Sequence, residues 1–129
     1  MQPEAAVHPL RLVRVLLVGT DARFLRVAGA LLAGEGHAVQ TSERPSELLE
    51  LVHALQTDVV VIDASSSVGQ AARAAASLEA LPRPVATVLV ADQERIPAVG
   101  PTLLAKWGSF DELSDRVHGA YDRRCRACA

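Results

Sequence analysis

Few residues in this chain combine a reactive type with a spacing that would support chemistry. Cys125 and Cys128 form a C-x-x-C pattern, which occurs in zinc sites and in redox motifs. A zinc site needs two more ligands, and none of the histidines is spaced as a ligand pair: His8, His37, His53 and His118. A redox pair normally stands at a helix start after a strand. We therefore expect two exposed thiols near the C-terminus and no metal site.

The turn VGTDARF, at residues 18–24, follows an apolar run as a phosphate-binding loop would. It lacks both the G-x-G-x-x-G and the G-x-x-x-x-G-K-[ST] patterns, so the backbone cradle for a phosphate is missing. A nucleotide-binding α/β protein is therefore a lesser alternative for this chain. The segment IDASSS, at residues 62–67, is similar to sulfate-transporter/anti-sigma-antagonist modules, which is a weaker alternative still.

Composition limits the classes of protein that this chain can belong to. With 129 residues, 50% of them hydrophobic and only 3% aromatic, it predicts one domain with an aliphatic core. A net charge of −2 does not favour direct nucleic-acid binding. No apolar run approaches the roughly 20 residues that span a bilayer. Residues 1–11 do not resemble a signal peptide, so we expect a flexible lead and a cytoplasmic protein.

Apolar runs predict strands at 12–18, 37–41, 58–63, 85–90 and 102–105. Apolar residues at helical spacing fill the first three connections and the segment after the last strand. This β-α-β order predicts an α/β fold, a doubly wound parallel sheet with helices on both faces. The fourth connection contains Pro97 and Gly100, so we expect its helix to be short or missing.

The order of elements and the residues at the strand ends resemble the receiver (CheY-like) domains of bacterial response regulators. The resemblance covers Val13 to Arg123, and we place the domain at 12–124 with a flexible tail at 125–129. It implies a five-stranded sheet of order 2-1-3-4-5, with the site at the carboxyl ends of the strands.

The resemblance implies a role for several residues at those strand ends. Asp63 stands at the position of the phosphoacceptor, and Lys106 at that of the family's lysine. Gly19 and Thr20 replace the acidic pair that holds Mg²⁺ in the family, so no cofactor is expected. Asp21 lies one residue further on; we expect it to cap the first helix, with metal binding a lesser alternative.

Two further family positions carry residues that cannot perform the family's switching chemistry. Val90 stands where the family has a Thr or Ser hydroxyl, and Leu103 where it has a switch aromatic. With both degenerate, we expect Asp63 and Lys106 to form a structural ion pair rather than a reactive acceptor.

We therefore expect a pseudo-receiver, not an enzyme, that acts in signalling or transcriptional control through phosphorylation-independent protein binding or dimerisation. The alternative is a working two-component phosphoacceptor that uses Asp63. We expect a protein partner or a homodimer through the fifth strand and the last helix, with Leu104, Trp107 and Phe110 as contacts.

Overall fold

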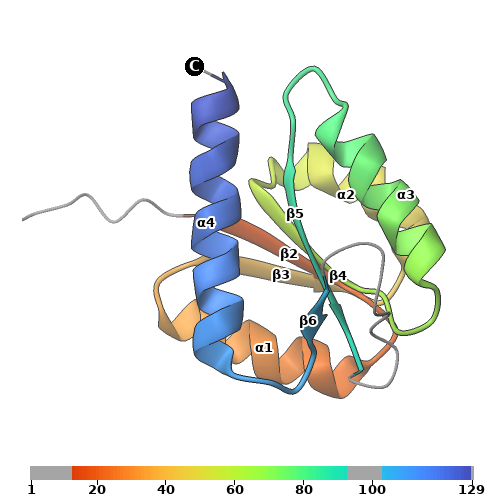
Figure 1. Ribbon diagram of the computed structural model, residues 1–129, viewed down its shortest axis with the longest axis vertical. Coiled ribbons are helices and arrows are strands. Elements are labelled where there is room, and N and C mark those ends of the chain that lie inside the picture. Colours follow the sequence, from red (N-terminus) through yellow and green to blue (C-terminus); the bar gives the residue numbers. More distant parts are fainter. Residues whose placement is uncertain (1–12, 93–102, 129) are drawn as a thin grey trace, which may run out of the picture.

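The sheet of this protein is fully parallel and has five strands, as the computed structural model of residues 13–92 and 103–128 shows (Figure 1). The strands are β2 (Arg14–Val18), β3 (Ala38–Ser42), β4 (Val59–Asp63), β5 (Ala86–Ala91) and β6 (Leu104–Ala105). Their order in the sheet is β3-β2-β4-β5-β6, which is the predicted 2-1-3-4-5 order. The predicted sheet is therefore confirmed.

The central strands β2 and β4 are made of almost continuous apolar sequence because helices cover both of their faces. Val59, Val60 and Val61 are completely buried. Strand β3 lies at one edge and is more polar, and β6 forms only a two-residue pairing with the end of β5.

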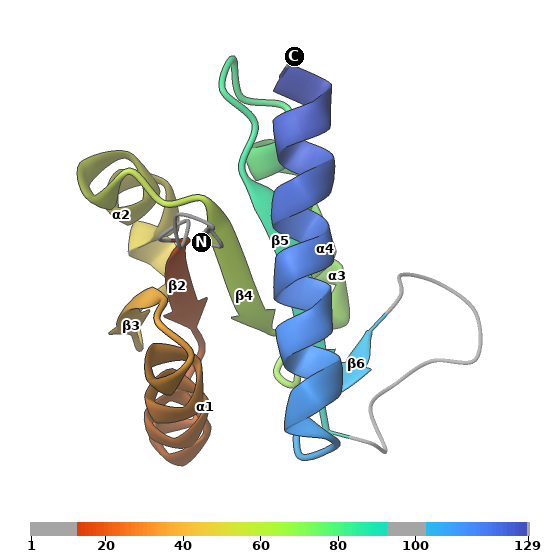
Figure 2. The same cartoon turned by 90° about the vertical axis from the view of Figure 1, so that its left-hand side faces the viewer.

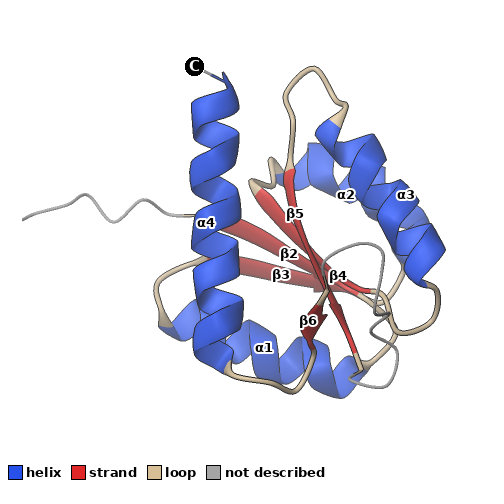
Figure 3. Cartoon of the chain, in the orientation of Figure 1, coloured by secondary structure: helices blue, strands red, loops and turns tan. Residues whose placement is uncertain are grey.

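Four α-helices connect or follow these strands in the described ranges (Figure 3). They are α1 (Ala22–Gly34), α2 (Leu48–Leu55), α3 (Val68–Glu79) and α4 (Phe110–Cys128), with a 3₁₀ turn at Pro45–Glu47 before α2. Side-chain caps start two of them: Asp21 accepts a hydrogen bond from Phe24 N at 3.2 Å, and Ser67 accepts one from Gln70 N.

The helices form two layers, one on each face of the sheet (Figure 2). Helices α1 and α4 pack on one face, where residues such as Leu32 and Val117 fill the core between helix and sheet. Helices α2 and α3 cover the other face with residues such as Val52 and Leu78. Successive side chains of each strand point to opposite faces of the sheet, so they contribute to two separate aliphatic cores.

Two predictions of domain boundaries need comment. Helix α4 continues to Cys128, so it includes residues 125–128 of the segment that was expected as a tail. Helical sequence without a proline or glycine stop after Gly119 explains the continuation. The predicted lead at 1–11 and the predicted loss of the fourth helix, at 93–102, lie outside the described residues. No helix in the described ranges is long and apolar enough to span a bilayer.

Candidate functional site

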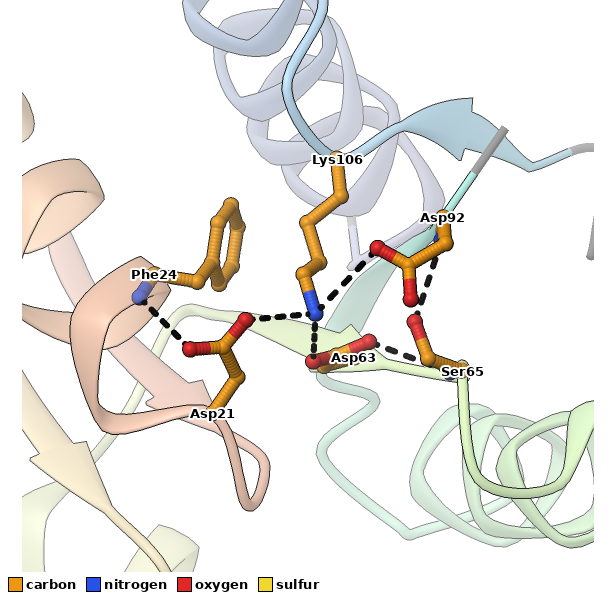
Figure 4. A network of polar contacts seen from close by, with 6 residues as sticks. All are labelled: Asp21, Phe24, Asp63, Ser65, Asp92 and Lys106. Carbon is orange, nitrogen blue, oxygen red and sulfur yellow. Dashed lines mark hydrogen bonds and ion pairs between the residues drawn. The ribbon is translucent and has the colours of Figure 1, made fainter. Parts of the chain in front are cut away.

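Four charged side chains meet at the carboxyl ends of the strands (Figure 4). Asp63 is the last residue of β4, Asp21 lies between β2 and α1, Asp92 follows β5, and Lys106 follows β6. Parallel strands end at the same edge of a sheet, so residues at these ends converge although the sequence separates them widely.

Lys106 is the centre of this cluster and the single lysine of the chain. Its Nζ lies 2.8 Å from Asp63 Oδ2, 2.8 Å from Asp21 Oδ2 and 3.7 Å from Asp92 Oδ1. The side chains of Lys106 and Asp63 are only 3% and 4% exposed. The predicted Asp63–Lys106 ion pair is therefore present, and it is buried.

The carboxylates are oriented by backbone donors as well as by the ammonium. Asp63 Oδ1 accepts a hydrogen bond from Ser65 N at 3.0 Å, which leaves Oδ2 for Lys106. Asp21 uses one oxygen as the cap of α1 and the other for Lys106, so it performs the predicted capping role and a second one. Ser65 Oγ accepts a hydrogen bond from Asp92 N at 3.0 Å, so Asp92 is connected to the loop that follows Asp63.

The pKa values of two members move in the direction that keeps the cluster charged. The hydrogen bond from Lys106, helped by that from Phe24 N, lowers the pKa of Asp21. Burial alone lowers the pKa of Lys106, but its hydrogen bonds to Asp21 and Asp63 outweigh burial and leave that pKa raised. Lys106 is therefore a fixed ammonium at neutral pH.

One of the two positions that correspond to the receiver family's acidic pair has no room for a side chain. A Cβ added to Gly19 would lie 2.6 Å from Asp63 Cβ, so no side chain fits there without a shift of the backbone. Thr20 is exposed. The carboxylate closest in sequence is Asp21, which already serves Lys106 and the helix N-terminus.

The two degenerate switch positions belong to the aliphatic cores. Val90 is buried on the face covered by α1 and α4, and Leu103 on the opposite face. Neither offers a polar atom to Asp63. A hydroxyl group does contact the cluster, but it is that of Ser65, which accepts a hydrogen bond from Asp92 N.

The predicted partner contacts do not all lie on the surface. Leu104 is buried in the core against α4, and it lines the same apolar pocket as Trp107 and Phe110. Trp107 is 51% exposed and stands edge-on to Phe24, with ring centroids 5.7 Å apart. The guanidinium of Arg23 lies 5.4 Å from the centre of the same ring, and Phe110 is half-buried.

Sequence reasoning missed two features. Asp92 was treated as part of a loop, although its place directly after β5 puts it at the same sheet edge as Asp63. A second cluster brings Glu35, His37 and His118 together, with ligand atoms within 4.8 Å of one another. Folding brings these residues together although no spacing along the sequence connects them.

Comparison with known proteins rests on structure. No family model matches the chain, and no curated protein matches it. A response regulator receiver protein from Burkholderia phymatum superposes with a TM-score of 0.69 at 18% identity, covering 85% of this chain and 95% of that one. The N-terminal domain of a response regulator/sensory box/GGDEF protein from Carboxydothermus hydrogenoformans gives 0.72 at 16% identity, covering 90% and 99%.

A third structure is the signal receiver domain of a DNA binding response regulator from Colwellia psychrerythraea 34H. It has a TM-score of 0.68 and 15% identity, and the match covers 83% of this chain and 96% of that one. The three match almost their whole length to this chain. The chain therefore has the receiver (CheY-like) fold of response regulators.

Proposed function

We propose that this chain is an atypical receiver, a pseudo-receiver, that acts in cytoplasmic signal transduction or transcriptional control. It binds a protein partner or a second copy of itself without phosphorylation, and it is not an enzyme. One observation carries the proposal: the ammonium of Lys106 stands among Asp21, Asp63 and Asp92, where a cation would otherwise offset their charge.

The donor set supports this proposal because it does not fit the Mg²⁺ ion that phosphorylation of a receiver requires. Mg²⁺ needs near-octahedral oxygen ligands, which the acidic pair supplies in typical receivers and which Gly19 and Thr20 replace in this chain. Position 19 has no room for a side chain, and Thr20 offers only a neutral hydroxyl. The inward oxygens of Asp21 and Asp63 are both engaged by Lys106.

The alternative, a phosphoacceptor that uses Asp63, is favoured by one feature of the same cluster. Three carboxylates surround one ammonium, so the cluster has more negative than positive charge. Such an excess attracts cations. The two functions therefore make opposite predictions about Mg²⁺.

Beryllofluoride, a mimic of a bound phosphoryl group, separates the two functions when it is added with Mg²⁺ at millimolar levels. A ligand that binds only the folded state raises the thermal midpoint. We expect the midpoint of the wild type to stay nearly constant, as in the control variant Asp63→Asn. A rise of several degrees in the wild type that disappears in Asp63→Asn would establish the phosphoacceptor instead.

The partner surface of this proposal lies beside Trp107. Its ring and the exposed side chains of Val27 and Leu31 border an apolar pocket between α1, the β6–α4 loop and the start of α4. Large exposed apolar side chains next to such a pocket are typical of association sites. Phe110 lines the same pocket and is half-buried.

Light scattering over a range of concentrations, with pull-down of native partners, tests this surface. We expect Trp107→Ala to weaken self-association or partner binding by at least about tenfold, as loss of a central aromatic contact does. Leu49→Ala is the matched control, since Leu49 is exposed to a similar degree (53% against 51%) but lies on α2. A wild type that stays monomeric, with the same partners retained by Trp107→Ala, would reject the surface.

A further inference from the structure

The second polar cluster is built from three separate elements on the α1/α4 side of the protein. Glu35 follows the last residue of α1, His37 immediately precedes β3, and His118 lies on α4. One ligand atom from each of the three lies within 4.8 Å of the other two. The cluster is independent of the Lys106 site, with which it shares no residue.

His37 is the member that lacks an internal explanation. Its side chain is 4% exposed, and neither ring nitrogen has a hydrogen-bond partner in the described part of the chain. Buried polar groups are almost always hydrogen-bonded, because an unsatisfied one costs about 1–3 kcal/mol. The imidazole of His37 therefore faces the cluster with neither ring nitrogen satisfied by the described residues.

The carboxylate of Glu35 lies near both imidazoles, at distances that a small side-chain movement would shorten to those between ligands of one metal ion. Glu35 Oε1 lies 4.0 Å from His37 Nε2 and 3.9 Å from His118 Nε2. The two imidazole rings are 4.9 Å apart between centroids. His118 and Glu35 are 53% and 39% exposed, so their side chains can rotate without disturbing the core.

Ser114 orients the carboxylate. Ser114 lies on α4, one helical turn before His118, and its hydroxyl donates a hydrogen bond to Glu35 Oε1 at 2.6 Å. Partners of this kind, which hold a ligand without touching the ion, are a regular part of metal sites. Ser114 is itself buried, so its position is fixed by the packing of α4.

We propose that Glu35, His37 and His118 bind a divalent transition metal ion of the zinc type. Two imidazoles and one carboxylate are a recognised ligand set for zinc, with water at the fourth position. Bonds of roughly 2.0–2.2 Å place two tetrahedral ligands about 3.4 Å apart. The two distances from Glu35 to the histidines, 3.9 and 4.0 Å, need a contraction of about half an ångström, and the third pair of ligand atoms, within 4.8 Å of each other, needs at most about 1.4 Å.

Binding at this place adds a second link between elements that the Ser114–Glu35 hydrogen bond already connects. The ion connects α4 to the turn between α1 and β3 and gives the buried His37 its missing partner. Metal binding therefore stabilises the folded domain by linkage, in addition to occupying the site.

Zinc titration of the full chain tests the proposal, with both cysteines changed (Cys125→Ser and Cys128→Ser) so that thiols do not compete. Competition with a chromophoric chelator gives stoichiometry and affinity, and circular dichroism gives the thermal midpoint. We expect one ion per chain, a raised midpoint, and affinity at least about tenfold weaker in Glu35→Gln and His118→Gln. Both positions are exposed, so these variants should fold.

His53→Gln is the matched control, since His53 is an exposed histidine on α2 outside the cluster. It should leave zinc affinity and the zinc-induced rise of the midpoint unchanged. Ser114→Ala should weaken binding by about tenfold if its hydroxyl orients Glu35. The proposal is overturned if the protein takes up no zinc, or if Glu35→Gln and His118→Gln bind it as tightly as their parent.

Discussion

The Lys106 cluster and the Glu35–His37–His118 cluster gather polar side chains in opposite ways. In the first, the buried Lys106 contacts three carboxylates, and the backbone donors of Phe24 and Ser65 hold two of them. In the second, the buried His37 has no hydrogen-bond partner among the described residues. In the first cluster the charged groups are hydrogen-bonding partners of one another, so no ligand is needed to hold them. In the second, a buried polar group without a hydrogen-bond partner indicates that a ligand is missing.

Removing the ammonium is the strongest test of the first half of this comparison. Lys106→Met leaves Asp63 buried at a few per cent exposure without its cation. We expect the free energy of unfolding to fall by about 3–5 kcal/mol, as when one partner of a buried ion pair is lost. Urea denaturation measures the change. The control is Arg44→Met, which removes an exposed pair with Glu47 and should cost less than about 1 kcal/mol.

A double-mutant cycle then shows whether Asp63 acts through Lys106. In the wild-type background Asp63→Asn leaves Lys106 with Asp21 and Asp92 as partners. In the Lys106→Met background the same change removes an unpaired charge, so we expect it to cost less than it does alone. Strict additivity of the two changes would mean that the two side chains are not coupled, against their 2.8 Å separation.

The sequence allowed prediction of the first cluster but not of the second, for a physical reason. The resemblance to receiver domains implied that Asp63 and Lys106 converge, and the physical reason is that all carboxyl ends of a parallel sheet lie at one edge. Asp92 follows the same rule and was overlooked. His37 and His118 meet only because α4 crosses the end of α1, a packing contact that periodicity does not encode.

The same reasoning explains which parts of the fold were predicted well. The positions of strands and helices follow from the hydrophobic pattern of long segments, and the strand order was implied by the resemblance to receiver domains; the sheet of the structure agrees with both. The hydrophobic pattern does not determine the direction of a single side chain in a two-residue strand. Leu104, expected as a partner contact, is an example, because it is buried.

Gly19→Ala tests whether the acid-pair position could hold any side chain. Its new Cβ would lie 2.6 Å from Asp63 Cβ, so the β2–α1 loop must shift, at a cost of about 1–3 kcal/mol. Gly34→Ala is the control, because no atom lies within 4 Å of its added Cβ; it should raise stability by about 0.4–1 kcal/mol. Equal stability of Gly19→Ala and the wild type would show room for a carboxylate and weaken the argument against Mg²⁺.

The smallest expected effect tests the second half of the comparison. With metal removed by a chelator, His37→Leu replaces an unsatisfied buried ring by an apolar side chain of similar size. We expect a change of less than about 1 kcal/mol in either direction, because the loss of ring packing is offset by removal of an unpaired polar group. Saturating zinc should then stabilise the wild type and leave His37→Leu unchanged. A metal-free cost as large as that of Lys106→Met would instead make His37 a structural residue, and the two clusters would no longer differ in kind.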